Sequence, residues 1–465
     1  MLVPARSRLA LSPTPDDSCG NQVTPDEWAC CRSGGTHNPL GPGSSLGGPT
    51  WRIGVVDKTV GTGQFVFRKL VILLTIGISA PSQAGDAPSG GRYDFDGNIS
   101  REVLENYLAR SLHMLGLADS DQFDEDLRMI KNIGAKHLGR VAAIWWDADC
   151  KVDMEAHFAR ARAAAARLHK MDPELMLQAC IFETVGKGVN GIPIPAWVFE
   201  EFAQKSEVRD FRFEDMCYED GFQGHGYGTM PPDMSRSESR MWFYYCGRRY
   251  IDCGYENIHV GMIGLMDRKD PKHENWFDTL GRLRRYAAKN ARRHRVLFDS
   301  QHRGIVENGK LLLDYHNMVL RPKDVIGSPE KCTLEMGYGD TIWGRSAGGI
   351  TPSGWPCDHL PYQAEFDNGY SPGKAGQNIG FPYAWGSIEI DWYARQTLEY
   401  RNEWLRYAWE WIRRVDPNGY LQMQGSKCLN PQDVRGAKWY HANTASQSCP
   451  DGFNQEETIR AIWKE

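Results

Sequence analysis

From residue 138 onward, short apolar runs alternate with helical patterns, and this alternation constrains the fold more than any other feature of the sequence. Alternating strands and helices are typical of βαβ units, which place parallel strands in one sheet. The patterns predict strands at 138–146, 175–182, 211–217, 257–265, 294–298, 310–320, 332–338, 360–366 and 419–423. They predict helices at 100–117, 121–133, 153–170, 195–204, 234–253, 276–292, 395–415 and 454–464.

Roughly eight strand-helix units over about 330 residues match an α/β fold of the (β/α)8 TIM type, which runs from about 200 to above 400 residues. Another α/β open sheet is the alternative. No Gly-x-Gly-x-x-Gly follows the predicted strand 138–146, which disfavours a dinucleotide-binding sheet. The stretch 339–380, rich in Gly, Pro, Ser and Asp, predicts long loops at the C-terminal face of the barrel.

The first 84 residues differ from the rest of the chain. Residues 1–65 are rich in Gly, Pro and Ser without periodicity, so we expect them to be disordered or a mis-annotated segment upstream of the true translation start. Residues 66–84 join Arg68-Lys69, an apolar stretch at 70–80 and a small-residue ending, which are the parts of a secretory signal peptide. That stretch is too short to span a bilayer. We expect translation to begin near Val66 and the protein to be secreted or periplasmic.

On this division, residues 85–99 are a linker and residues 100–465 form a single barrel of the catalytic type. The charge balance, 54 Lys and Arg against 59 Asp and Glu, offers no broad basic surface for nucleic acid. No apolar run reaches 18 residues, so no membrane span is expected after removal of the signal. Nine cysteines follow residue 84, an odd number that leaves at least one free thiol.

Carboxylates follow the predicted strands at the end where a barrel carries its active site. The candidates for catalysis are Glu183, Asp299, Glu365 and Asp367. Two opposed carboxyl groups suit the cleavage of a glycosidic bond, because one protonates the leaving oxygen while the other attacks or activates water. Glu365 is the expected nucleophile or base and Glu183 or Asp299 the expected general acid. Asp367 is expected to tune the pKa of its neighbour.

Aromatic and polar side chains accompany these acids. Flat rings suit the C–H faces of sugars, and they occur at strand ends or in the loops that follow, at Trp145, Trp146, Trp343, Trp355, Tyr383 and Trp385. His302, His316 and Arg345 are expected to hydrogen-bond sugar hydroxyls, or a carboxylate or sulfate on the substrate. We expect a carbohydrate partner, and neither a cofactor nor a metal.

The export signal, the barrel rhythm and the tryptophan-bordered acids resemble a secreted bacterial glycoside hydrolase of the (β/α)8 type. This architectural resemblance covers about residues 100–465 and implies an exported hydrolase of O-glycosyl bonds in a poly- or oligosaccharide. In the largest clan of such enzymes the acid lies at the end of strand four and the nucleophile at the end of strand seven. Glu365 or Asp367 fits strand seven, whereas the predicted fourth strand has no carboxylate before Asp267.

The missing acid on strand four supports an alternative, a barrel that binds glycans without cleaving them. A weaker alternative is a metal-dependent hydrolase, in which His302 or His316 would join Asp299 or Asp314 around an ion. Metal-dependent barrels of the amidohydrolase type begin with His-x-His on strand one, whereas the strand predicted first here ends in Trp145-Trp146-Asp147.

The signal-peptide hypothesis predicts the N-terminus of the exported protein. Expressed in a bacterial host, the full chain should yield a secreted product whose N-terminal sequence begins near Gly85. A secreted product that contains Met1 or any part of residues 10–60 would contradict the hypothesis.

Overall fold

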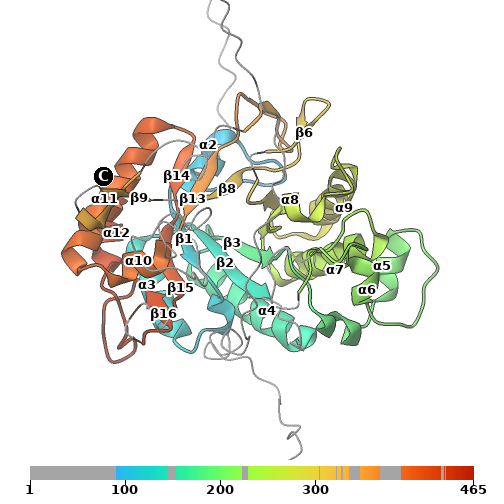
Figure 1. The fold of residues 1–465 in the computed structure, drawn as a ribbon, viewed down its shortest axis with the longest axis horizontal. Coiled ribbons are helices and arrows are strands. Elements are labelled where there is room, and N and C mark those ends of the chain that lie inside the picture. Colours follow the sequence, from blue (N-terminus) through green and yellow to red (C-terminus); the bar gives the residue numbers. More distant parts are fainter. Residues whose placement is uncertain are drawn as a thin grey trace, which may run out of the picture. The chain divides into compact units, whose positions relative to one another are not determined.

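A computed structural model describes residues 91–144, 152–222, 229–302, 304–320, 322–325, 328–334, 346–366, 389–430, 434 and 436–465. Strands and helices alternate through most of these residues, and the central strands run in parallel. The predicted α/β class with a parallel sheet is therefore confirmed (Figure 1).

The larger sheet has the strand order β16-β15-β1-β2-β3-β4-β5. Its strands are β1 (Ser111–Met114), β2 (His137–Ile144), β3 (Met176–Ile181), β4 (Asn257–His259), β5 (Leu297–Asp299), β15 (Met423–Cys428) and β16 (Trp439–His441). Neighbours from β15 to β5 pair in parallel, whereas β16 pairs with β15 in the antiparallel sense.

A smaller parallel sheet has the order β14-β13-β8. Its strands are β8 (His316–Val319), β13 (Tyr362–Glu365) and β14 (Gly419–Leu421). The strand pairings thus form two parallel sheets rather than one closed ring. The sheets meet at two places: the Asn317 N–H donates to the Ser300 carbonyl at 3.0 Å, and Gln422 alone separates β14 from β15.

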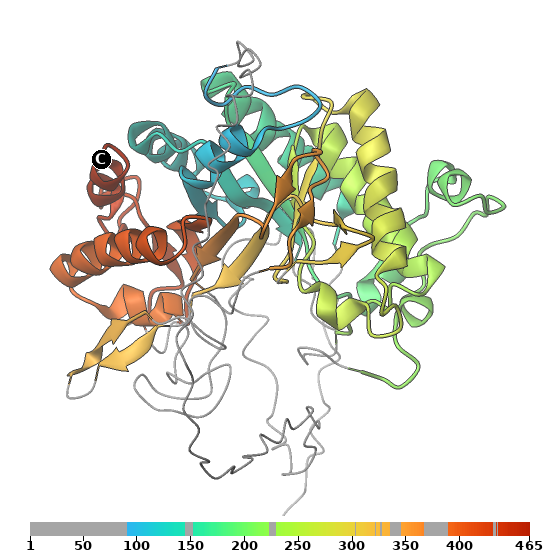
Figure 2. The same ribbon diagram turned by 90° about the horizontal axis from the view of Figure 1, so that it is seen from above.

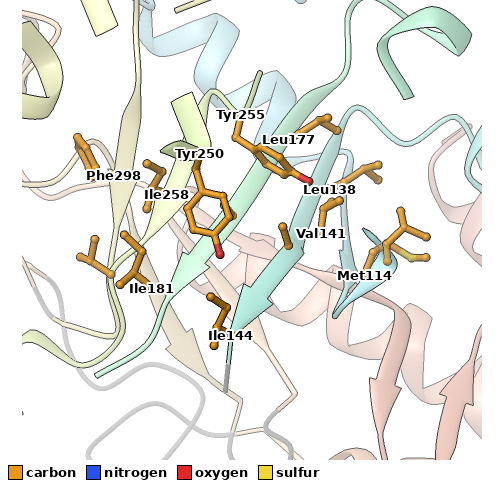
Figure 3. Packing of buried hydrophobic residues seen from close by; sticks show 14 of the residues in the cluster. Met114, Leu138, Val141, Ile144, Leu177, Ile181, Tyr250, Tyr255, Ile258 and Phe298 are labelled. Atoms are coloured by element: carbon orange, nitrogen blue, oxygen red, sulfur yellow. The ribbon is translucent and has the colours of Figure 1, made fainter. Parts of the chain in front are cut away.

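Helices cover one face of the larger sheet. In Figures 1 and 2, α4 (Met154–Met171), α7 (Ser237–Cys253) and α9 (Glu274–Asn290) follow one another along the β2 to β5 side. Figure 3 shows the apolar layer between this face and the helices, in which Tyr250 of α7 and the neighbouring Tyr255 lie over β2 and β3. The strands contribute Met114, Leu138, Val141, Ile144, Leu177, Ile181, Ile258 and Phe298 to this layer.

The remaining elements surround these sheets. The helices are α2 (Arg101–Leu108), α3 (Phe123–Ile133), α5 (Ala196–Glu201), α6 (Phe213–Met216), α8 (Ile263–Met266), α10 (Glu389–Arg395), α11 (Leu398–Val415) and α12 (Glu456–Ile462). Short strands are β6 (Val306–Glu307), β7 (Lys310–Leu311), β9 (Lys323–Val325), β10 (Ser328–Thr333), β11 (Gly349–Ile350) and β12 (Pro356–Cys357). No helix of the described residues is both long enough and apolar enough to cross a membrane.

Two predicted elements are wrong. The expected helix 100–117 ends at Leu108, and β1 follows it at Ser111–Met114. Such a short apolar strand cannot be told from a continuing helix by periodicity. The expected strand 211–217 is instead the single-turn helix α6, whose residues Phe213 and Met216 are buried. One strand, β1, was missed before residue 138, and one strand too many was predicted at 211–217. The strand predicted as fourth is therefore still the fourth parallel strand along the chain, β4.

Two other predicted strands are shorter than expected. The strand expected at 257–265 stops at His259, and the chain then turns through Gly261, whose φ of +64° favours glycine, into α8. The stretch expected at 310–320 divides into β7 and β8, which belong to different sheets.

The segment before α2 is packed against the domain. Tyr93, Phe95 and Ile99, which fall in the stretch expected as a linker, are buried together with Tyr107 and Leu297. The helix itself begins as predicted at Ser100, whose hydroxyl accepts a hydrogen bond from the Val103 N–H at 3.2 Å. This N-cap satisfies one of the free amides of the first turn.

Replacing Ser100 by Ala should lower the free energy of unfolding by about 1 kcal/mol, because the Val103 amide loses its acceptor. Urea unfolding followed by circular dichroism measures this difference. Ser448→Ala is the matched control, because Ser448 is exposed and lies outside any helix. Equal stability of the two variants would contradict a stabilising role for the cap.

Candidate active site

The face of the larger sheet opposite the apolar layer carries polar side chains. Gln363 and Glu365 of β13 and the linking residue Gln422 contact these side chains. We call the combined set the polar face, and its members are Ser111, His113, His137, Arg140, Gln178, Asn257, His259, Asp299, Gln363, Glu365, Gln422 and Lys427. All of them are buried. Residues alternate between the two faces of a strand, so Asn257 and His259 project opposite to Ile258, and Asp299 opposite to Phe298. Parallel strands that are buried on both faces usually consist almost entirely of apolar residues, and this buried polar face departs from that rule.

Glu365 is the centre of a buried charge cluster. Its Oε1 lies 2.5 Å from Nη2 of Arg140, and its Oε2 lies 3.5 Å from Nζ of Lys427. Burial opposes ionisation of Glu365, but the charges of Arg140 and Lys427 outweigh it and hold the pKa of the carboxyl well below its usual range. Glu365 is therefore an ionised carboxylate, suited to act as a nucleophile or base and unsuited to donate a proton.

A neutral histidine completes the surroundings of Glu365. Burial, together with the charge of Lys427, lowers the pKa of His113 to about 3. Nδ1 of His113 lies 3.0 Å from Glu365 Oε2 and 3.0 Å from Gln422 Oε1. Glu365 Oε2 therefore faces His113 and Lys427, while Oε1 faces Arg140.

Asp299 lies at the end of β5 beside His259 of β4. Its Oδ2 is 2.7 Å from His259 Nδ1, and its Oδ1 accepts a hydrogen bond from Gln178 Nε2 at 2.8 Å. The other ring nitrogen of His259, Nε2, lies 3.5 Å from Arg140 Nη2. Arg140 thus connects two of the acids predicted from sequence. It contacts Glu365 directly, and it reaches Asp299 through His259.

The backbone of β2 is distorted where Arg140 enters the polar face. Arg140 has a φ of +53°, which is uncommon for a residue with a side chain, and the pairing of β2 with β3 shifts between Leu138 and Ala142. Gln178 holds this distortion, because its Oε1 accepts from the Arg140 N–H at 2.9 Å. The same amide therefore positions Arg140 through its oxygen and Asp299 through its nitrogen.

Glu183, the third described candidate acid, lies beside the turn that follows β4. Its Oε2 accepts a hydrogen bond from the Met262 N–H at 3.2 Å. The approach to Gly261 is close, since a Cβ built on that glycine would lie only 2.2 Å from Glu183 Oε2. The absence of a side chain at Gly261 thus leaves room for the carboxylate.

Two predicted binding residues lie away from the charge cluster. Trp355 donates from Nε1 to the Ile99 carbonyl at 3.2 Å and packs in the cluster that contains Met176 and Leu297, the first residues of β3 and β5. It therefore lies at the amino ends of the strands. His316 pairs in register with Tyr362, not with Glu365, and its ring centroid lies 5.2 Å from that of Tyr362. Side chains alternate along β13, so Tyr362 and the neighbouring His316 lie on the face of the smaller sheet opposite to Glu365.

His302 lies just beyond β5, at the carboxyl end of the sheet, and is partly exposed. The other predicted site residues, Asp367, Trp145, Trp146, Trp343, Arg345, Tyr383 and Trp385, fall outside the residues that the structure describes.

Four residues of the charge cluster and its surroundings were not predicted from the sequence: His113, Arg140, His259 and Lys427. A signal existed for Arg140, because a charged residue directly follows Leu138-Gly139 in a predicted apolar strand.

Within the described ranges, no group of three or more His, Cys, Asp or Glu side chains is placed to hold a metal ion. The described thiols of Cys180, Cys217, Cys246, Cys253, Cys357 and Cys449 are free and buried. Burial raises the pKa of the Cys180 thiol well above its usual value, which disfavours the reactive thiolate.

Replacing Glu365 by Gln should lower the free energy of unfolding at neutral pH by about 3 kcal/mol, because it removes the buried charge that faces Arg140 and Lys427. Thermal and urea unfolding measure the loss. The matched control is Glu155→Gln, which breaks the pair with Arg249 at 2.6 Å, where Glu155 is 76% exposed. That change should cost less than about 1 kcal/mol. Similar losses in both variants would contradict the electrostatic account.

Comparisons with solved structures find proteins that align with less than half of the chain. No protein-family model matches the chain, and no curated protein matches it in sequence. A maltogenic α-amylase from Thermotoga neapolitana is 10% identical over 45% of this chain and 47% of its own length, with a TM-score of 0.27. A GH36 α-galactosidase from Geobacillus stearothermophilus is 11% identical over 42% of this chain and 30% of its own, with a TM-score of 0.25. The debranching enzyme of Nostoc punctiforme is 9% identical over 41% of each chain, with a TM-score of 0.26. The chain thus spans half or less of these three proteins.

Proposed function

We propose that this protein is a glycoside hydrolase that cleaves an O-glycosyl bond in a poly- or oligosaccharide, with Glu365 as its nucleophile or base. One observation carries the proposal. Glu365 is an ionised carboxylate buried at the end of a parallel strand, and Arg140 and His259 connect it to a second acid, Asp299. A pair of acid and base groups across a cleft is the arrangement that glycosidic cleavage requires.

We also infer that the two parallel sheets are parts of one (β/α)8 barrel with long loops at its C-terminal face. The supporting contacts lie where the sheets meet. Asp314 and Asn317 donate backbone hydrogen bonds to Phe298 and Ser300 at 2.9 and 3.0 Å, and β14 runs into β15 through Gln422. On this inference the polar face is the barrel interior, and its charged residues lie toward the carboxyl ends of the strands, where barrel enzymes carry their active sites.

The substrate proposal rests on the polarity of this interior. Hydroxyl groups of a sugar can replace the hydrogen bonds that buried carboxylates and amides need. Asp367, Arg345, Trp145, Trp146, Tyr383 and Trp385, together with His302, remain proposed members of the site. Export through the segment 66–84 and a catalytic domain at 100–465 also remain proposals.

A second candidate function is glycan binding without cleavage. The observation in its favour is that β4 ends at His259 and no carboxylate follows before Asp267. A screen for hydrolysis products separates the two functions, because a binding protein would bind oligosaccharides without producing new reducing ends.

The test is a screen of the full chain against polysaccharides and aryl glycosides for released reducing ends or phenol. Replacing Glu365 by Ala should lower kcat by about 10³-fold or more on any substrate found, because the reaction loses its nucleophile or base. If Glu365 is the nucleophile, sodium azide should restore turnover to this variant by entering the vacated space and should yield a glycosyl azide.

Glu155→Ala serves as the control, since that residue lies on the exposed surface. Full turnover in Glu365→Gln, Asp299→Asn and Glu183→Gln alike would overturn the proposed site. Binding of glycans with no product from any member of the panel would favour the second function instead.

A further inference from the structure

The end of β4 carries an imidazole where a carboxylate was expected. His259 is the last residue of that strand and pairs in register with Asp299 of β5. Nδ1 of His259 lies 2.7 Å from Asp299 Oδ2, a distance typical of a strong hydrogen bond to a carboxylate. Asp299 is held in turn by Gln178 at 2.8 Å. The carboxylate therefore fixes the ring with a proton on Nδ1, as in the acid-base dyads of hydrolases, and Nε2 faces Arg140 Nη2 at 3.5 Å.

Arg140 links Nε2 of His259 to Glu365. One nitrogen of Arg140, Nη2, lies 3.5 Å from His259 Nε2 and 2.5 Å from Glu365 Oε1. The imidazole nitrogen and the carboxylate oxygen can therefore be no farther apart than the sum of these two distances. This upper limit is close to the separation of about 5–5.5 Å between the two catalytic groups of retaining glycosidases.

We propose that His259, oriented by Asp299, is the proton donor and acceptor of the reaction and replaces the carboxylic acid missing from β4. The inference rests on the proposed function, with Glu365 as nucleophile. His259 is then a catalytic residue and Asp299 a positioning residue, in place of the acid role expected for Asp299 from sequence.

The reaction takes two steps, and His259 recovers in the second the proton that it gives up in the first. In the first, a Glu365 oxygen bonds to the anomeric carbon, the bond from that carbon to the leaving oxygen breaks, and the proton on His259 Nε2 passes to the leaving oxygen. In the second, water attacks the anomeric carbon, its proton returns to Nε2, and the bond to Glu365 breaks. The products are two hydroxyl-bearing sugars, and the imidazolium and carboxylate are both regenerated.

The surrounding groups suit this role. The charged and titratable groups that face His259 are Asp299 on β5, Arg140 on β2 and Cys180 on β3, with Glu365 beyond Arg140. Asp299 holds the imidazole through Nδ1, while Glu365 balances the charge of Arg140. Glu183 is held elsewhere, because its Oε2 accepts the Met262 N–H at 3.2 Å.

The dependence of the rate on the leaving group tests the assignment. Wild type, His259→Gln, Asp299→Asn and Glu183→Gln are compared on a 2,4-dinitrophenyl glycoside and on the methyl glycoside of the same sugar, chosen by screening dinitrophenyl glycosides. Dinitrophenolate leaves without a proton, whereas methanol needs one. His259→Gln should lose about 10²- to 10⁴-fold in kcat/KM on the methyl glycoside and less than about 10-fold on the dinitrophenyl glycoside. Asp299→Asn should lose a smaller factor in kcat/KM, again mainly on the methyl glycoside. Glu183→Gln should change kcat/KM by the same factor on both glycosides.

A measurement on the wild type guards against a variant that fails to fold. Nitrogen-15 NMR of the histidine rings at alkaline pH should show the neutral His259 ring with its proton on Nδ1, and Asp299→Asn should shift the proton toward Nε2. A neutral wild-type ring protonated on Nε2 overturns the proposal.

The kinetic outcomes separate the two levels of inference. Equal losses of His259→Gln on both glycosides, or leaving-group discrimination by Glu183→Gln alone, overturn the role of His259 while the glycosidase function stands. If the wild type hydrolyses no glycoside of the panel, the proposed function fails, and the role of His259 fails with it.

Discussion

The ion pair between Arg140 and Glu365 is the interaction on which the rest of the polar face depends. Both side chains are almost completely buried, with exposed fractions of 6% and 1%. Removing such charges from water is costly unless each finds a close partner, and here they approach to 2.5 Å. Lys427, His113 and Gln301 complete the coordination of the same carboxylate at 3.5, 3.0 and 3.2 Å. The sheet therefore carries a fixed, pre-oriented electrostatic field where an enzyme would need one.

The distortion of β2 is the structural cost of this arrangement. Arg140 adopts a backbone conformation that side chains disfavour, and one glutamine amide, that of Gln178, compensates by holding the Arg140 N–H. The neighbouring Gly139 leaves no room for a side chain, since an added Cβ would lie 2.6 Å from Gln422 Nε2. Strain, close packing and buried charge thus coincide within two consecutive residues, a combination found more often at functional sites than in structural cores.

Sequence reasoning found the acids but not their partners. Glu183, Asp299 and Glu365 follow apolar runs, and apolar runs are what strand prediction detects. Arg140 and Lys427 lie within strands, where inward and outward residues alternate over only a few positions and a polar residue reads as an interruption. His259 ends β4, but the strand predicted there ran on to residue 265 and placed it inside the strand. β1 was missed because its pattern continues that of the preceding helix. Trp355 was assigned to the wrong end of the strands because sequence order does not show to which end a long connection returns.

The separation of these partners along the chain has a consequence for biosynthesis. Arg140 precedes Glu365 by 225 residues, and β1 pairs with β15 from the far end of the domain. At a synthesis rate of about 5–20 residues per second, Arg140 leaves the ribosome roughly 10 to 45 s before its counter-charge. Throughout that interval the guanidinium must stay hydrated, and the first strands cannot bury their inner face. β1 therefore lacks its neighbour β15 until the last strands are made, so a premature stop after α11 would leave Glu365 without Lys427 and β1 without β15.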